Sequence, residues 1–210
     1  NQLSNIPGDR IQEKVLSVLE LSYNYLSEEQ KSVFLLCGLL GQAQISILVL
    51  LQYCWGLGIF KSIYRVVDAW NRLLTLIDDL VATSLIISFN KDDALIKIHD
   101  MICDTAASIA TKTQNAFTIR NDCELEKWPA NSLIHSCTRI CLPNCNVSEL
   151  PSTLDCPNLE VFLFQAVDHN VNIPNSFFEV TTNLQVVTLN NITTMLPTSL
   201  ESLSNLRTLC

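Results

Sequence analysis

The chain has 210 residues, of which 48% are hydrophobic and only 16% are charged, and its formal net charge is −8. This length allows two small domains, or one domain with part of another. A charged share below the usual quarter or so indicates surface that is meant to be covered. The acidic balance argues against the basic surface that binds phosphate backbones, so we expect no nucleic-acid partner.

The cysteines and the first residues bear on the cellular compartment. Nine cysteines at irregular spacing do not read as a disulfide framework. The first residues, NQLSNIPGDR, lack the basic and then apolar plan of a signal peptide. We therefore expect reduced thiols in a cytoplasmic protein. Because the chain begins without methionine and stops at Cys210 with no terminating element, we also expect it to be a fragment.

Helical spacing of apolar residues marks the start of the chain. Residues 11 to 26 predict a helix with one buried stripe. Ser27 and Gln30 then match a capping box, which predicts the start of a second helix. The side chains expected to point inward are Ile11, Val15, Val18 and Leu19 in the first helix, and Val33, Phe34, Cys37 and Leu40 in the second.

A long uncharged run raises the alternative of a membrane protein. No charged residue occurs from Ser32 to Phe60, and an apolar run of this length can span a bilayer. The residues Gly-Gln-Ala-Gln at 41–44 split it below the ~20 residues that a span needs. We therefore predict two buried helices, at about 34–40 and 45–55, and no membrane span.

The next elements indicate a small mixed module. Residues 68–82 predict an amphipathic helix with Asp68 as its N-cap. The runs 84–89 and 94–99, joined by the four residues 90–93, predict a hairpin. A helix with Asp100 as N-cap follows at once. Several helices, a hairpin and a further helix suit a winged-helix module; many such modules bind DNA, but the basic residues here are scattered.

The buried faces of these two helices can be read from their spacing. We expect Ala69, Leu73, Leu76, Ile77 and Leu80 to be inward in the first, and Ile102, Ala106 and Ile109 in the second.

From residue 137 the sequence repeats with a period of about 23 residues. A template of the form L-x-x-L-x-L fits three times and begins a fourth time, and an apolar residue followed by proline recurs between the matches. Two markers with one period, in the length range of leucine-rich repeats, predict a solenoid. The template matches are Cys137-Ile140-Leu142, Leu159-Phe162-Phe164, Leu184-Val187-Leu189 and Leu206-Leu209, and the pairs are Leu150-Pro151, Ile173-Pro174 and Leu196-Pro197.

The repeat pattern assigns side chains to two faces of a sheet. Template residues should form the core, and the residues between them should lie on a concave face that is most simply an inert, solvated surface. The concave residues are expected to be Arg139, Cys141, Val161, Leu163, Val186, Thr188 and Thr208.

The even spacing of Cys137, Cys141 and Cys145 leaves a metal site as an alternative. Zinc and cluster sites favour tighter pairs such as C-x-x-C. The repeat template accounts for Cys137 and Cys145, so we expect no metal. The three histidines form no convincing triad with a nucleophile, so we expect no catalytic residue.

Several stretches resemble plant NB-ARC disease resistance proteins. The run LELSYNYLSEEQKSVFLLCGLL resembles the segment that opens their winged-helix subdomain, and DAWNRLLTLIDDL resembles a later helix. IKIHDMICDTAASIA resembles their MHD motif with its following helix, with Ile98 where methionine is usual. LEKWP, CPNLEVFLF and NLRTLC resemble the junction and early repeats of the coiled-coil branch. We expect Ile98 to point to the core, which makes this departure mild.

The resemblance implies a function. Such receptors hold ADP between a P-loop domain and the winged-helix domain at rest, exchange it for ATP when a pathogen is perceived, assemble, and trigger defence. His99 and Asp100 are the counterparts of the motif residues at the ADP, and are the cofactor-binding residues we expect. The implied partners are a pathogen effector or a guarded host protein, the upstream nucleotide-binding subdomains, and further copies in an activated oligomer.

Together these features predict an α+β chain in three segments. We expect a winged-helix domain at 1–112, a linker at 113–136 and truncated leucine-rich repeats at 137–210. The chain contains no G-x-x-x-x-G-K-[ST] sequence, so we expect it neither to catalyse a reaction nor to bind ADP or ATP alone. The alternatives are a leucine-rich-repeat scaffold without nucleotide switching and a membrane-associated repeat protein.

Overall fold

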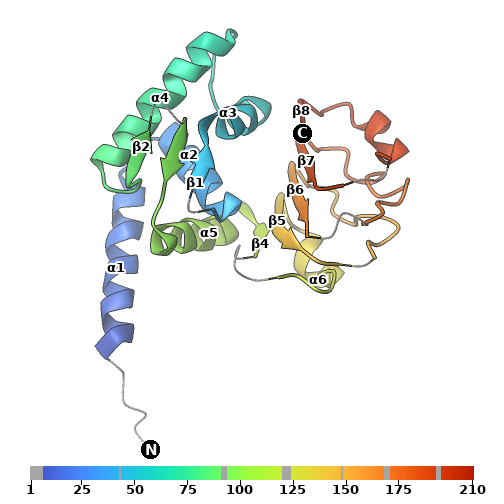
Figure 1. Ribbon diagram of the computed structural model, residues 1–210, viewed down its shortest axis with the longest axis horizontal. Helices are drawn as coiled ribbons and strands as arrows, with labels where there is room; N and C mark the ends of the chain where they lie inside the picture. The colour runs from blue at the N-terminus through green and yellow to red at the C-terminus, as the bar shows by residue number, and fades with distance from the viewer. Residues whose placement is uncertain are drawn as a thin grey trace, which may run out of the picture.

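The computed structural model describes residues 7–42, 44–90, 94–119, 124–147, 149–167, 171–192 and 195–210. A helical part with a small sheet lies beside a solenoid-like part built on a five-stranded parallel sheet (Figure 1). The α+β prediction is therefore confirmed. The elements are α1 (Pro7–Asn24), α2 (Glu28–Leu40), β1 (Gln44–Ser46), α3 (Ile47–Gly56), α4 (Val66–Ala82), β2 (Ser88–Asn90), β3 (Leu95–Lys97), α5 (Asp100–Gln114), β4 (Ala116–Thr118), α6 (Asn131–Ile134), β5 (Arg139–Cys145), β6 (Val161–Ala166), β7 (Val186–Asn190), the 3₁₀ helix η1 (Thr198–Ser202) and β8 (Thr208–Leu209).

Helix α2 forms the centre of the helical part. Every residue from Val33 to Leu40 is buried, because neighbouring elements cover this half of the helix all round. At Gly38 the backbone of α5 comes so close that an added Cβ would lie 2.4 Å from the Cβ of Ala106. The inward faces predicted for α2 and α4 are confirmed.

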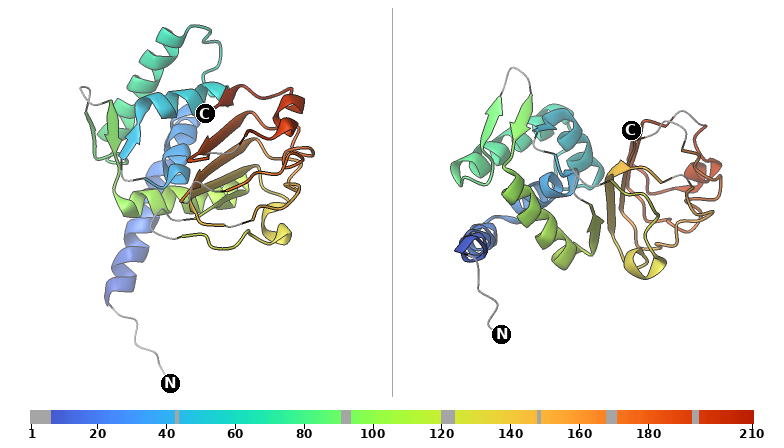
Figure 2. Two further views of the ribbon diagram at one scale, coloured as in Figure 1. Left: turned by 45° about the vertical axis from the view of Figure 1, so that its right-hand side comes forward. Right: turned by 60° about the horizontal axis from the view of Figure 1, so that its bottom comes forward.

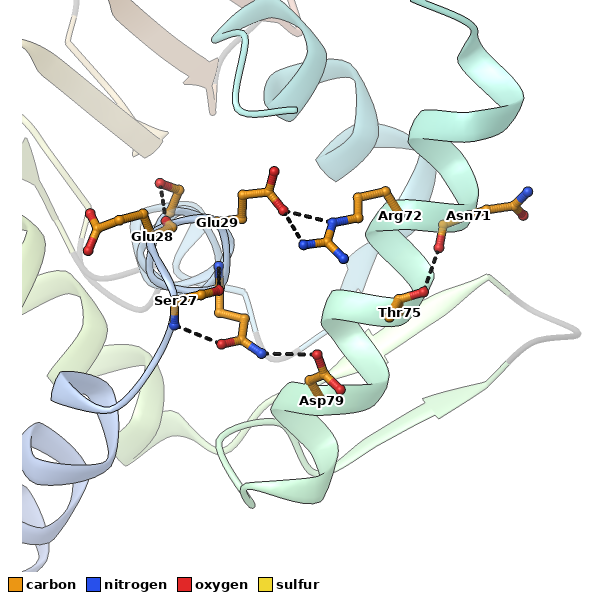
Figure 3. Close-up of polar contacts among 9 residues, drawn as sticks. Ser27, Glu28, Glu29, Asn71, Arg72, Thr75 and Asp79 are labelled. Carbon is orange, nitrogen blue, oxygen red and sulfur yellow. Dashed lines mark hydrogen bonds and ion pairs between the residues drawn. The ribbon is translucent and has the colours of Figure 1, made fainter. Parts of the chain in front are cut away.

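The start of α2 is tied to α4 by polar contacts (Figure 3). The predicted capping box is present, since the Ser27 N–H donates to Oε1 of Gln30 at 2.8 Å and the Gln30 N–H donates to Oγ of Ser27. The Gln30 side chain also donates to Asp79 on α4 at 3.0 Å. Arg72, about two turns away on α4, donates from Nε to Glu29 at 2.7 Å. These contacts fix the crossing of α2 and α4.

Strands β1, β3 and β2 form an antiparallel sheet in that order. The predicted hairpin is confirmed by β2 and β3, while residues 91–93 of its turn lie outside the described residues. The prediction of a helix from residue 45 was wrong at its start, because residues 44–46 pair with β3 and α3 begins at Ile47. No helix in the described part of the chain is long and apolar enough to cross a membrane.

Two further details of the helices differ from prediction. Helix α1 extends away from the body of the molecule (Figure 1) and packs through Leu19 and Tyr23, so Val18, expected inside, is 61% exposed. Asp68 is not the N-cap of α4: the helix starts at Val66, Arg65 is the N-cap, and no side chain caps it. Asp68 instead lies in the first turn, where a carboxylate is favourable.

The second part is a parallel sheet in the order β4-β5-β6-β7-β8, with one strand for each predicted repeat (Figure 2). Ile140, Phe162 and Val187 align across three neighbouring strands and are fully buried, so the predicted repeat register is confirmed. Phe177 and Phe178, from the returning segment, pack on Phe162 with ring centroids 5.7 Å and 5.6 Å away. The first strand, β4, lies in the segment expected as a linker and pairs with β5.

Candidate functional site

His99 and Asp100 lie where β3 passes into α5. Ile98, before them, is 4% exposed, which confirms that it points into the core. His99 is exposed and has extended backbone angles. Its carbonyl accepts the first helical bonds of α5, from the N–H groups of Ile102 at 2.8 Å and Cys103 at 3.0 Å. His99 therefore lies directly before the first residue of α5, at the N-terminus of the helix.

The N-cap of α5 is His99, so the prediction that Asp100 caps the helix was wrong. Nδ1 of His99 accepts a hydrogen bond from the N–H of Met101 at 3.2 Å. A ring nitrogen that accepts carries no proton, so the proton of the neutral ring lies on Nε2, which remains a donor. Asp100 is displaced by one residue into the first turn, where its exposed carboxylate meets the positive end of the helix dipole.

The surroundings of His99 limit what it can hold. A helix N-terminus favours an anion, but Asp100 in the first turn and Asp104, one turn further along, place negative charge near it. The two carboxylates also affect Cys103. Its pKa rises to about 11, mainly because the thiol is buried and further because Asp100 and Asp104 disfavour a negative charge nearby. His99 is therefore one donor beside a partly neutralised helix end, and a phosphate would need further donors from elsewhere.

A second feature appears where the two parts of the molecule meet. The strands' concave face was expected to be solvated, and this was wrong. Val161 and Val186 are 0% exposed, and Thr188 is 3% exposed. They point away from the solenoid core, and Val161 and Val186 join the same apolar cluster as the helical part. The physical reason is that α3 packs on this face (Figure 1).

Helix α3 makes three close contacts with the concave face. The hydroxyls of Tyr53 and Thr188 are 3.0 Å apart and buried. The Thr208 hydroxyl donates to the Gln52 carbonyl at 3.1 Å. Gly56 allows the closest approach, since an added Cβ would lie 2.5 Å from Oγ1 of Thr208 and 2.7 Å from Cγ2 of Val186. The helix and the strands are therefore fitted to each other in detail.

These interface residues were missed because α3 was taken as a helix inside one core. The signal was available in the absence of charge from Ser32 to Phe60. A helix without a polar face must be buried on both sides. The helical part buries only one side of such a helix, so a second part of the molecule has to bury the other. Tyr53 is the residue that this reasoning would have selected, because a buried tyrosine hydroxyl needs a partner.

Arg139 has buried polar atoms without a partner at this interface. It stands at the start of β5, in register with Val161. Its Nε and Nη1 are buried without a hydrogen-bond partner, and desolvation lowers the pKa of its guanidinium. Its charge is felt at Cys54 on α3 and at Cys141 on β5, where it offsets part of the rise in thiol pKa that burial causes.

Seven of the eight cysteines that the structure describes are buried, and Cys210 is exposed. Cys137 and Cys145 belong to the solenoid core, whereas Cys141 faces the helical part. Burial raises the pKa of the Cys141 and Cys156 thiols to about 12 each, so these side chains behave as small apolar groups. In the described ranges, no three His, Cys, Asp or Glu side chains are placed to hold a metal ion.

The fold and this interface define a repeat protein in which a helical module covers the concave face of the first repeats. No family model matches the chain. Similar curated proteins exist in Arabidopsis thaliana. The chain is 26% identical over 208 residues to probable disease resistance protein At4g27220, covering 97% of this chain and 22% of that protein.

Two further relatives show the same extent of similarity. Probable disease resistance protein At5g47250 is 30% identical over 202 residues, which cover 93% of this chain and 24% of that protein. Disease resistance protein RFL1 is 26% identical over 204 residues, 94% of this chain and 23% of that protein. Over most of its length, the chain is thus related to plant disease resistance proteins, which confirms the resemblance, and it spans under a quarter of their length.

Proposed function

We propose that the chain is the part of a cytoplasmic plant immune receptor that joins a nucleotide-sensing winged-helix module to the first sensor repeats. The observation that carries this proposal is the extent of the similarity to disease resistance proteins, which covers 97% of the chain in one relative and so includes both modules and their junction. The proposal assigns the chain a binding and coupling role without chemistry of its own.

The helical part supports a winged-helix assignment through its element order. Helix α2, strand β1, helices α3 and α4, and then the hairpin β2–β3 follow one another along the chain. The first strand joins the hairpin at its edge, which gives the sheet order β1-β3-β2. The order of several helices, a hairpin and a further helix is the one that the sequence predicted, although strand β1 was not part of that prediction.

His99 supports the nucleotide role through its tautomer. In the proposed receptor, Nε2–H donates to an ADP phosphate supplied from the upstream subdomains, while Nδ1 caps α5. A hydrogen bond to a charged group contributes about 1.5–3 kcal/mol. The carboxylates of Asp100 and Asp104 repel an anion, so in the proposed receptor most of the phosphate contacts come from the upstream subdomains. His99 adds one contact that forms only in the ADP-bound resting state.

The covered concave face supports a sensor role for later parts of the solenoid. The strand residues that would otherwise meet an effector or guarded host protein are already in contact with α3. In the proposed receptor these first repeats hold the switch, and partners bind elsewhere on the solenoid. A scaffold without a switch would leave this face open for its partners.

Two substitutions in the full-length receptor test the proposal. His99→Ala removes both the cap and the Nε2 donor, whereas His99→Asn keeps a capping oxygen and replaces the Nε2 donor with a carboxamide N–H on a shorter side chain, which does not extend to the same position. Both variants are expected to retain ADP roughly 10- to 150-fold less well, which corresponds to the loss of about 1.5–3 kcal/mol, and to cause unprompted cell death. Asp104→Asn is the matched control, because it keeps His99 and reduces repulsion. ADP retention that is unchanged in His99→Asn would remove His99 from the site.

A further inference from the structure

A cavity of about 180 Å³ lies between the two parts of the molecule, beside the contact of Tyr53 with Thr188. One wall comes from the end of α2, β1 and α3, and the other from β5, β6, β7 and the chain end. The volume far exceeds the ~10–15 Å³ that one water molecule requires. It falls below the ~300–1,000 Å³ of sites for drug-sized ligands, so any molecule that fits it is smaller than these ligands.

The lining of this interface cavity carries no charge. None of the described residues around it is Asp, Glu, Lys, Arg or His. Four carboxamides line it, two from each wall: Gln42 and Gln52 from the helical part, and Gln165 and Asn190 from the strands. A carboxamide offers both an acceptor oxygen and a donor nitrogen. Hydroxyl side chains also line the cavity, and apolar side chains lie between the polar groups, with Val49 on one wall and Leu163 on the other.

The two strand carboxamides form a pair. Gln165 and Asn190 are direct neighbours in the parallel register of β6 and β7, so they present their side chains at the spacing of adjacent strands, about 4.8 Å. Gln52 faces them from α3 and is close to Cys210, whose Sγ lies 3.7 Å from Oε1 of Gln52. Polar groups on both walls around an apolar middle are typical of small-molecule sites.

We propose that this interface cavity binds a small neutral molecule with amide or hydroxyl groups, held between the helical part and the repeats. A polyphosphate is disfavoured as its ligand, because the lining has no cationic side chain to offset several negative charges. The hydroxyl of Tyr53 stays protonated, since burial raises its pKa to about 12, which keeps this wall neutral. A ligand that touches both walls favours the docked arrangement over a separated one. The inference is independent of the nucleotide role.

Disulfide capture at Cys210 tests this proposal. Cys210 lines the cavity and is exposed, whereas the other described cysteines are buried; Cys123, outside the described residues, is replaced by serine. The chain is equilibrated with two disulfide probes that share one linker, a benzamide and the matching benzoate. We expect the benzamide to be captured at least about tenfold more, because the cavity cannot solvate a carboxylate.

Two variants separate the cavity from its surroundings. Val49→Trp fills it from α3 and Gln165→Trp fills it from β6. Both are expected to abolish the preference for the benzamide while Cys210 still reacts normally with cystamine. A preference for the benzamide that survives in both tryptophan variants would arise outside the cavity and would overturn the proposal. Equal capture of the two probes by the parent chain would overturn it as well.

Folding of the variants is checked by circular dichroism and by cystamine reactivity. If a tryptophan variant lacks the parent spectrum, Val49→Phe replaces it, because this smaller side chain also enters the cavity from α3. Loss of the preference for the benzamide in Val49→Phe supports the proposal, and a preference that survives in it overturns the proposal.

Discussion

The hydroxyl of Tyr53 on α3 lies 3.0 Å from the hydroxyl of Thr188 on β7, in a buried hydrogen bond between the helical part and the repeats. Each hydroxyl is the other's partner, and both residues are buried, with 4% and 3% of their surface exposed. Tyr53→Phe should therefore destabilise the chain by about 1–3 kcal/mol, because Thr188 is left buried and unpaired. Thr188→Val should do the same to Tyr53.

The double variant of Tyr53→Phe with Thr188→Val should lose less than the sum of the single losses. Urea unfolding of the parent, the two single variants and the double variant gives the coupling energy. In the double variant no unpaired hydroxyl remains, because both hydroxyls have been removed. Strict additivity would mean that the two hydroxyls are independently solvated.

Gly56→Ala should weaken the contact between the two parts of the molecule. Its Cβ would approach Thr208 and Val186 within 2.5 Å and 2.7 Å, and overpacking of this kind costs about 1–3 kcal/mol. Hydrogen exchange should become faster in α3 and β7. Gly38→Ala is the matched control, because its Cβ meets Ala106 inside the helical part and should increase exchange in α2 and α5 instead. Identical exchange patterns in the two variants would contradict this division.

Arg139→Met should stabilise the chain. The substitution removes two buried donors without partners and keeps an unbranched side chain of similar length, so we expect a gain of about 1–3 kcal/mol. Arg207→Met, at an exposed position, should change stability by no more than about 0.5 kcal/mol. Denaturant unfolding compares both variants with the parent, and a loss of stability in Arg139→Met would show that the guanidinium has an effective partner.

Alkaline pH should destabilise the interface through Cys141 and Tyr53. Burial raises the pKa of Cys141 from 9.0 to about 12 and that of Tyr53 from 10.0 to about 12. The unfolded chain therefore loses these protons first, and stability that is complete below about pH 9 declines as the pH rises toward 12. Each group contributes a slope of up to about 1.4 kcal/mol per pH unit.

The pH dependence is measured by urea unfolding at about pH 8, 9.5 and 10.5, with the parent as reference. Cys141→Val should reduce the slope from about pH 9, and Tyr53→Phe should reduce it only above about pH 10. A parent curve without any decline above pH 9 would show that these side chains are hydrated in the folded state.

The chain alone should not bind ADP or ATP usefully. His99 offers a single contact worth at most about 3 kcal/mol, whereas association costs an estimated 4–15 kcal/mol in lost freedom. Calorimetric titration of the chain with ADP is expected to show no heat of binding at micromolar concentration. A micromolar dissociation constant would mean that these residues form a complete pocket, and the divided site proposed above would be wrong.

Elements with a strong internal period were predictable from the sequence. The buried face of α4 and the repeat register follow from apolar spacing, because these elements turn one face toward a core within their own part of the chain. Apolar spacing also identified inward residues of α2, but not that every residue from Val33 to Leu40 is buried. Strand β1 was not predictable by this means: its three residues pair with β3, about fifty positions later, and nothing local distinguishes them from the start of α3.

The candidate site was located by its motif but not in its details. Asp is a better N-cap than His by general preference, yet the strand leading into α5 ends one residue earlier than this preference suggested, so His99 caps the helix. The concave face was misjudged for a different reason. Arg139 and Thr188 look like solvated residues in the sequence, and only the docking of α3, which is a tertiary contact, removes them from water.

Helix α5 runs directly from His99 to the repeat sheet. Its 15 residues form a strut of about 22 Å. His99 caps one end, and at the other Asn115 turns the chain with a φ of 44° so that β4 starts at the very next residue. The N–H of Thr138, just before β5, donates a hydrogen bond to the Asn115 carbonyl at 3.1 Å. Only Asn115 separates the end of α5 from β4. A shift of α5 along its axis at the His99 end would therefore also move the first strand of the solenoid.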